Sequence, residues 1–98
     1  MLFAIEWAPF GGTSEEQQKV SLARFTKWQP PEGVEFKGFY DFADGNGGLA
    51  IAETSSAEAL LESVAPWTEM RFSIRPIVPS EQSVPIVQKA YAWRDSVS

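Results

Sequence analysis

The stretch that decides the fold spans residues 34–54 and reads VEFKGFYDFADGNGGLAIAET. Residues 34–42 place large apolar side chains at alternating positions, which is typical of a half-buried strand. Residues 43–48 hold Asp, Asn and three Gly, the strongest turn signal in the chain. Residues 49–54 then alternate large and small apolar side chains. This pattern predicts an antiparallel hairpin with strands at 34–42 and 49–54.

The residues before the hairpin predict one strand and one helix. Residues 2–8 carry large apolar side chains at every second position, which indicates a strand. Ser14 and Gln17 have the spacing of a capping box, so a helix is expected to begin near Ser14. The Pro30-Pro31 pair should end that helix, because proline lacks the N–H that helical hydrogen bonding needs.

The residues after the hairpin predict a second helix, a fourth strand and a helical tail. Ser55 is expected to cap the helix, with Glu58 completing a capping box. Residues 70–78 alternate apolar with polar side chains and predict a strand. The tail should be helical from Ser83, with Pro85 tolerated in its first turn.

The predicted order is strand, helix, strand, strand, helix, strand, followed by the tail helix. Right-handed crossovers place both helices on one face of a four-stranded antiparallel sheet with strand order 4-1-3-2. The fold class is therefore α+β, with a ferredoxin-like βαββαβ arrangement. We expect one domain at residues 1–80, and a C-terminal tail at 81–98 that could contact a partner subunit.

Alternation within the predicted strands divides the sheet into two faces. The large apolar face is expected to comprise Phe3, Ile5, Trp7, Phe36, Tyr40, Leu49, Ile51, Phe72 and Ile74. The opposite face would comprise Ala4, Glu6, Lys37, Phe39, Asp41, Ala50, Ala52, Arg71, Ser73 and Arg75. Phe39 interrupts the alternation of its strand. Both faces remain candidates for the one that the helices cover.

Composition excludes several classes of function. The chain has no Cys and no His, which removes disulfides, thiolate metal sites and histidine-based catalysis. Its net charge of −5 and scattered basic residues argue against a nucleic-acid partner. Aromatic residues make up 13% of the chain, which is more than one small core needs, so we expect a second subunit or a ligand to cover some of them.

The N-terminal residues indicate neither a secretion signal nor a membrane anchor. No basic leader precedes the first apolar residues, and Glu6 interrupts them early. No stretch approaches the roughly 20 apolar residues of a membrane span. A cytoplasmic location without membrane association is therefore expected.

Four segments resemble a family of short bacterial proteins known as a domain of unknown function. These segments are Met1–Phe3, Pro31–Val34, Glu53–Thr54 and Trp67–Val78. The family is similar to the dimeric α/β-barrel superfamily, in which two ferredoxin-like subunits pack sheet against sheet. The resemblance spans residues 1–80 and implies a homodimer. Pro66, at the usual end of the second helix, and the C-terminal tail depart from the pattern.

Three charged residues are candidates for a polar pocket. Glu6, Asp41 and Arg71 share a predicted face, and the strand order brings them toward one end of the sheet. They could form a charged pocket for a small polar substrate. The plainer alternative, which we favour, is an ion pair at the rim of the sheet or between subunits.

A second candidate pocket lies on the apolar face. Trp7, Tyr40 and Phe72 could line an apolar cavity, or they could simply pack in the core. Glu53 shares this predicted face and would act as a general acid or base if it were buried. If it lies at the end of its strand, it would reach solvent instead.

Two functional hypotheses follow. The first is a homodimeric module for small-molecule binding or assembly. The second is a cofactor-independent enzyme, monooxygenase-like or isomerase-like, acting on a small aromatic or polyketide-like substrate, as the superfamily resemblance permits. Neither hypothesis requires a cofactor or a metal. A deep cavity that Glu6, Asp41 or Glu53 enters would favour the enzyme.

Overall fold

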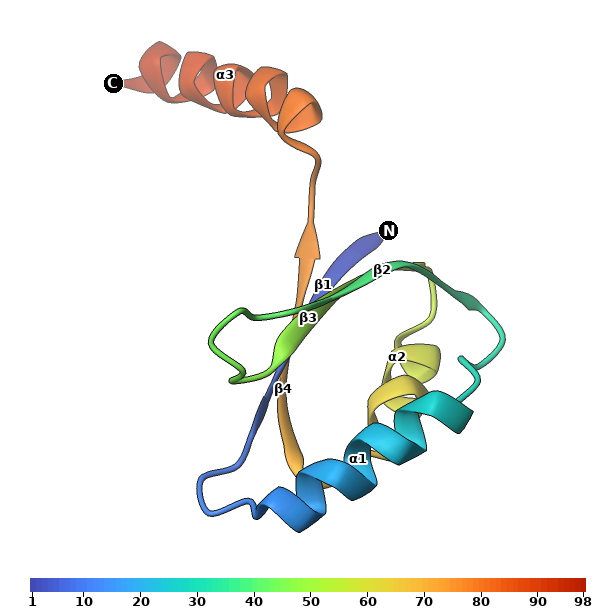
Figure 1. Cartoon of the computed structure of the whole chain (residues 1–98). Helices are drawn as coiled ribbons and strands as arrows, with labels where there is room; N and C mark the ends of the chain where they lie inside the picture. Colours follow the sequence, from blue (N-terminus) through green and yellow to red (C-terminus); the bar gives the residue numbers. More distant parts are fainter.

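The computed structural model describes residues 1–98 and has the predicted order of elements. Helices α1 and α2 lie on one side of the sheet (Figure 1). The four strands form one antiparallel sheet in the order β2-β3-β1-β4, which confirms the ferredoxin-like arrangement. The elements are β1 (Leu2–Pro9), α1 (Glu15–Lys27), β2 (Val34–Asp41), β3 (Gly48–Thr54), α2 (Ala57–Val64), β4 (Met70–Ile77) and α3 (Ser80–Val97).

Helix α1 begins as its sequence predicts. The Ser14 hydroxyl accepts a hydrogen bond from the Gln17 N–H at 3.1 Å, and the Gln17 side chain accepts one from the Ser14 N–H at 2.8 Å. This reciprocal capping box satisfies two N–H groups that lack partners inside the helix. The helix ends at Lys27, before the two prolines.

The start of helix α2 differs from the prediction by one residue. Ser56, rather than Ser55, caps the helix and accepts a hydrogen bond from the Ala59 N–H at 3.1 Å. The cause is Thr54, whose hydroxyl accepts from the Ser56 N–H at 3.0 Å and donates to the Gly33 carbonyl at 2.6 Å. These bonds hold Ser56 in the extended conformation of a cap, so the predicted capping box with Glu58 does not form.

Several side chains lie on the face of the sheet opposite the predicted one, and a β-bulge in β2 is one cause. Phe36 pairs with Ala52, but Gly38 pairs with Ile51, so the register shifts between Phe36 and Gly38. Because one extra residue reverses the side-chain alternation, Phe39 points toward the helices. The bulge moves Phe39, Tyr40 and Asp41 to the faces opposite those predicted. On β3 the predicted faces are reversed for Leu49, Ala50, Ile51, Ala52 and Glu53, because Ala50 pairs with Ile5 and Glu53 pairs with Leu2.

The core lies between the sheet and helix α2, and it is thin. Only nine of the 98 residues are buried. The buried apolar residues are Ile5, Ala50, Ala52, Ala59 and Leu60. Partly buried Phe3, Trp7, Val34, Phe36, Val64, Phe72 and Ile74 pack around them. The helices therefore cover the face that carries Ile5, which resolves the question of orientation.

Helix α3 stands apart from the rest of the chain (Figure 1). It begins at Ser80, earlier than predicted, because the Gln82 and Ser83 N–H groups both bond to the Pro79 carbonyl. Pro85 consequently lies beyond the first turn, where its missing N–H removes a helical hydrogen bond. No residue of α3 is buried. No helix of the structure is long and apolar enough to span a membrane.

Candidate functional site

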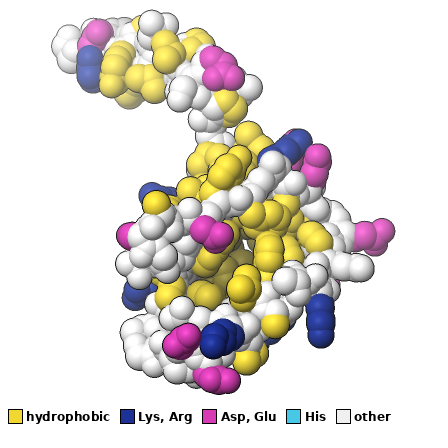
Figure 2. All heavy atoms as spheres, viewed as in Figure 1, with side chains coloured by type: hydrophobic (Ala, Val, Ile, Leu, Met, Phe, Trp, Pro, Cys, Tyr) yellow, Lys and Arg dark blue, Asp and Glu magenta, His cyan; other side chains and the backbone are white.

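A cavity of about 530 Å³ opens between helix α1 and the sheet. Figure 2 shows the hollow, with hydrophobic side chains around it. Its volume lies within the range that small-molecule sites occupy. Small residues form part of the wall on the sheet side, because Ala50 and Gly47 leave space that a larger side chain would fill. Of its 21 lining residues, 12 are hydrophobic, so the cavity suits a mainly apolar molecule.

Five interacting aromatic rings form one wall of the cavity. The rings belong to Phe25 and Trp28 of α1, Phe36 and Phe39 of β2, and Trp67 from the loop before β4. Phe36 and Phe39 stack at 5.0 Å between ring centroids, while Trp28 and Trp67 meet edge to face at 5.1 Å. Such pairs orient one another, so the wall is held in place by its own contacts.

The rings reach the same wall from three segments because of local sequence features. The bulge turns Phe39 to the same face as Phe36, and Phe25 then meets Phe39 edge to face at 5.3 Å. Trp28 follows the last residue of α1 in an extended conformation. These features bring the end of helix α1 against the middle of β2, from Phe36 to Phe39.

An ion pair fixes helix α1 to the loop between α2 and β4. The Arg24 guanidinium donates to the Glu69 carboxylate at 2.7 Å and to the Pro66 carbonyl at 3.1 Å. Helix α2 ends at Val64, so Pro66 follows the helix and its carbonyl is free to accept. Partial burial is the largest single influence on the pKa of Glu69, and it opposes ionisation. Hydrogen bonds from Ser21, from its own backbone and from Arg24 outweigh that effect and lower the pKa of Glu69.

The lowered pKa of Glu69 predicts a loss of stability in acid. A carboxylate with a depressed folded pKa contributes stability above its unfolded pKa, which is about 4.5, and loses it as the pH falls through the folded pKa. Glu69→Gln should lower the free energy of unfolding by about 1 kcal/mol at pH 7. The difference in free energy of unfolding between the variant and the parent should shrink toward pH 3. Urea denaturation between pH 3 and pH 7 checks this. Glu62→Gln, at an exposed position of α2, is the control, and a difference for Glu69→Gln that does not change with pH would contradict the assignment.

The structure separates the six predicted site residues. Trp7 and Asp41 line the cavity. Glu6 and Arg71 lie on the opposite face, where they border a smaller groove of about 270 Å³. Glu6 pairs there with Arg75 at 2.9 Å and not with Arg71. The predicted convergence of Glu6 and Arg71 with Asp41 therefore does not occur, because the bulge moves Asp41 to the helix-covered face.

Tyr40 and Glu53 also lie on the uncovered face. Tyr40 is 59% exposed and pairs with Leu49, and its ring lies back over Gly38, where a side chain would collide with it. Glu53 forms an ion pair with Lys37 at 3.3 Å, and Lys37 also contacts Glu35 at 3.2 Å. The hydrogen bond to Glu35, and secondly the one to Glu53, raise the pKa of Lys37.

Sequence reasoning missed most of the aromatic wall. Phe25 and Trp28 were recognisable as an apolar stripe on the first helix, but the stripe does not reveal which part of the sheet it faces. The interrupted alternation at Phe39 was the available signal, since a bulge is what such an interruption indicates. Trp67 carried no periodic signal because it lies in a loop.

The fold and the cavity together define a ferredoxin-like α+β domain with an open, aromatic-lined pocket between helix and sheet. Residues 1–91 match a protein family described as a domain of unknown function (DUF3303), and the chain belongs to that family. The match extends past residue 80 into helix α3, so the first part of the tail belongs to the family pattern. Neither a curated protein nor a solved structure matches the chain.

Proposed function

We propose that the protein is a homodimeric small-molecule binding module whose ligand occupies the cavity beneath helix α1. The observation that supports this most strongly is the wall of five rings, which leaves space open instead of filling it. Close packing normally stabilises an interior, so an apolar cavity of this size in a thin core favours a ligand. Trp7 and Asp41 are the predicted site residues that would contact it.

Replacing one ring of the wall should weaken binding. Phe39→Ala removes a ring that stacks on Phe36 and lines the cavity, so the affinity for a neutral aromatic probe such as 2-naphthol should fall about tenfold. Isothermal titration of the parent and the variant measures the change. Phe42→Ala is the matched control, because Phe42 is similarly exposed but does not line this cavity. Equal affinities for all three proteins would contradict the proposed site.

Two unpartnered surfaces support the homodimer. The uncovered face of the sheet has an apolar centre at Ala4, Leu49 and Ile51, bordered by the Glu6–Arg75 and Lys37–Glu53 ion pairs. Helix α3 leaves its large apolar side chains in solvent, namely Val84, Ile86, Val87, Tyr91, Trp93 and Val97. Exposed large apolar side chains in this number favour a protein interface. We propose that residues 1–80 form the domain and that the 81–98 tail contacts the second subunit.

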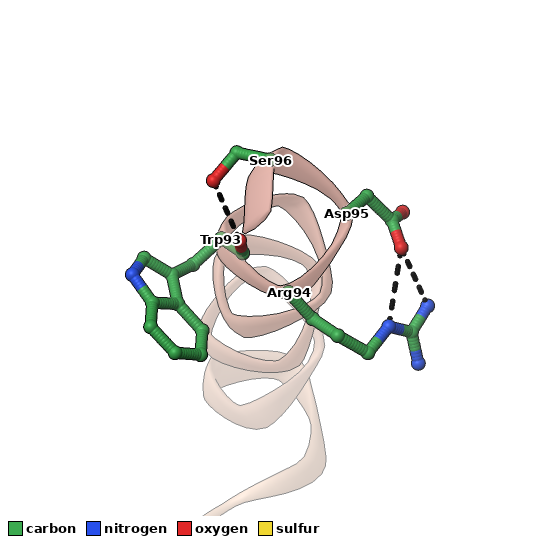
Figure 3. Close-up of polar contacts among 4 residues, drawn as sticks. All are labelled: Trp93, Arg94, Asp95 and Ser96. Atoms are coloured by element: carbon green, nitrogen blue, oxygen red, sulfur yellow. Dashed lines mark hydrogen bonds and ion pairs between the residues drawn. The ribbon is translucent and has the colours of Figure 1, made fainter. Parts of the chain in front are cut away.

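The last turn of α3 shows how its polar and apolar groups are arranged. Figure 3 shows the Trp93 indole pointing outward, away from the helix axis. The Ser96 hydroxyl donates to the Trp93 carbonyl at 2.6 Å, and Arg94 forms two hydrogen bonds to Asp95 at 3.0 and 3.1 Å (Figure 3). The polar groups therefore satisfy one another and leave the indole, which is 69% exposed, free to contact a partner.

A charge on either surface should dissociate the dimer. The parent should sediment at twice the chain mass at micromolar concentration, whereas Ile51→Lys and Trp93→Lys should sediment nearer the monomer mass, because burying an unpaired ammonium is costly. Val20→Lys, at an exposed position of α1, is the control and should stay dimeric. Circular dichroism of each variant shows whether the fold is intact. A monomeric parent would contradict the homodimer.

One observation favours the enzyme alternative. Asp41 lines the cavity, so one of the three candidate carboxylates is in place to accept a proton from an aromatic or polyketide-like substrate. Glu6 and Glu53, on the other face, could not take part. Turnover of such a compound by the parent, lost in Asp41→Asn, would support catalysis over binding alone.

A further inference from the structure

The charged residues around the cavity leave one carboxylate without a partner. Glu15, Lys19 and Asp41 are the charged residues that line it. Glu15 and Lys19 pair with each other at 3.5 Å along helix α1. The Asp41 carboxylate has no ion-pair or hydrogen-bond partner among the side chains or backbone groups of the chain. The lining therefore carries one uncompensated negative charge and no Arg.

Asp41 lies beside the aromatic part of the cavity. It follows Phe39 by two residues on the same strand and face, a separation of about 7 Å along an extended strand. Its partner across the ladder is Gly48, which in turn pairs with Trp7. A side-chain carbon at Gly48 would lie 2.7 Å from Trp7 Cζ2, so the absence of that carbon lets the indole extend over Gly48 toward Asp41.

An aromatic face next to an unpaired carboxylate favours a positively charged group. The ring quadrupole attracts a cation placed over its face, most strongly for Trp, and the carboxylate adds a charge of opposite sign. The net charge of −5 raises the local concentration of cations around the protein and repels anions. Asp41 is exposed, so with a neutral ligand its carboxylate would interact with solvent alone.

We infer that the ligand of this cavity is a hydrophobic organic cation, with its positive group between Asp41 and Trp7 and its apolar part against the rings of Phe39, Phe36 and Trp28. The inference rests on the proposed binding function and specifies the chemical class of its ligand.

Three probes of similar size and different charge test this inference. Phenyltrimethylammonium is the cation, tert-butylbenzene is its neutral isostere, and benzenesulfonate is an anion. Chemical-shift titration of the backbone amides gives a dissociation constant for each probe on the full-length protein. The cation should bind at least tenfold more tightly than its isostere, and the anion should be the weakest of the three.

Asp41 variants identify the source of that preference. Asp41→Asn should remove most of the difference between the cation and its isostere, while Asp41→Glu should retain it. Asp44→Asn is the matched control: it changes the net charge equally, keeps an oxygen that can accept from the Asn46 N–H, and does not line the cavity. Equal binding of cation and isostere, or a preference that survives Asp41→Asn, would overturn the cation inference and leave the binding function intact. Failure of all three probes to shift the cavity amides would overturn both.

Discussion

Gly47→Ala should lower the free energy of unfolding by about 3 kcal/mol or more, which is a large part of the stability of a domain of this size. Gly47 has a φ of 103°, a conformation that residues with a Cβ rarely adopt. An added Cβ would also overlap the backbone carbonyl of Trp7 on the neighbouring strand. Backbone atoms of a paired strand cannot move aside easily, so the hairpin would have to separate from β1.

Gly45→Ala is the matched control for this prediction. Gly45 lies in the same hairpin with a φ of 79°, but an added Cβ would meet nothing within 4 Å. That variant should lose only about 1 kcal/mol, the cost of the backbone conformation alone. Urea denaturation of both variants measures the difference. Equal losses would show that the close approach of Gly47 to Trp7 does not contribute.

Ile5→Ala should lower the free energy of unfolding by about 3 kcal/mol, because Ile5 and Leu60 are the only large side chains among the buried apolar residues of a thin core. Ile5 is 3% exposed and pairs with Ala50 on one side and Ile74 on the other. Its two neighbours on β3, Ala50 and Ala52, are too small to fill the space that would be left. The deleted atoms would therefore leave a void that the surrounding residues cannot close.

Val20→Ala serves as the reference for that change. Val20 is 56% exposed on helix α1, and the substitution also improves helix propensity, so its stability should stay within about 0.5 kcal/mol of the parent. Thermal and urea denaturation of both variants compare the two sites. A loss at Ile5 no larger than at Val20 would mean that the core lies elsewhere.

The order of the elements could be predicted from the sequence because each has a distinct local signal. The hairpin is marked by a glycine-rich turn between two alternating runs, and α1 by a capping box and a proline pair. These signals depend only on neighbouring residues. The strand order then follows from right-handed crossovers, which is why the topology matched as well.

The side-chain directions were less predictable because they depend on register. A single bulge after Phe36 moved Asp41 into the cavity and Tyr40 out of it, and only pairing with β3 reveals the shift. The cavity was less predictable still. Its volume depends on how far α1 stands from the sheet, which is set by ring packing and by the Arg24–Glu69 pair across distant parts of the chain.

The four tryptophans provide the most direct test of the cavity as a ligand site. Trp7, Trp28 and Trp67 line it, whereas Trp93 lies on helix α3. Their indole N–H groups give separate signals in a proton–nitrogen correlation spectrum recorded during titration with 2-naphthol. The binding proposal predicts that the three cavity signals shift together and saturate while the Trp93 signal stays in place. Movement of the Trp93 signal alone, or no movement of any signal at millimolar probe, would contradict it.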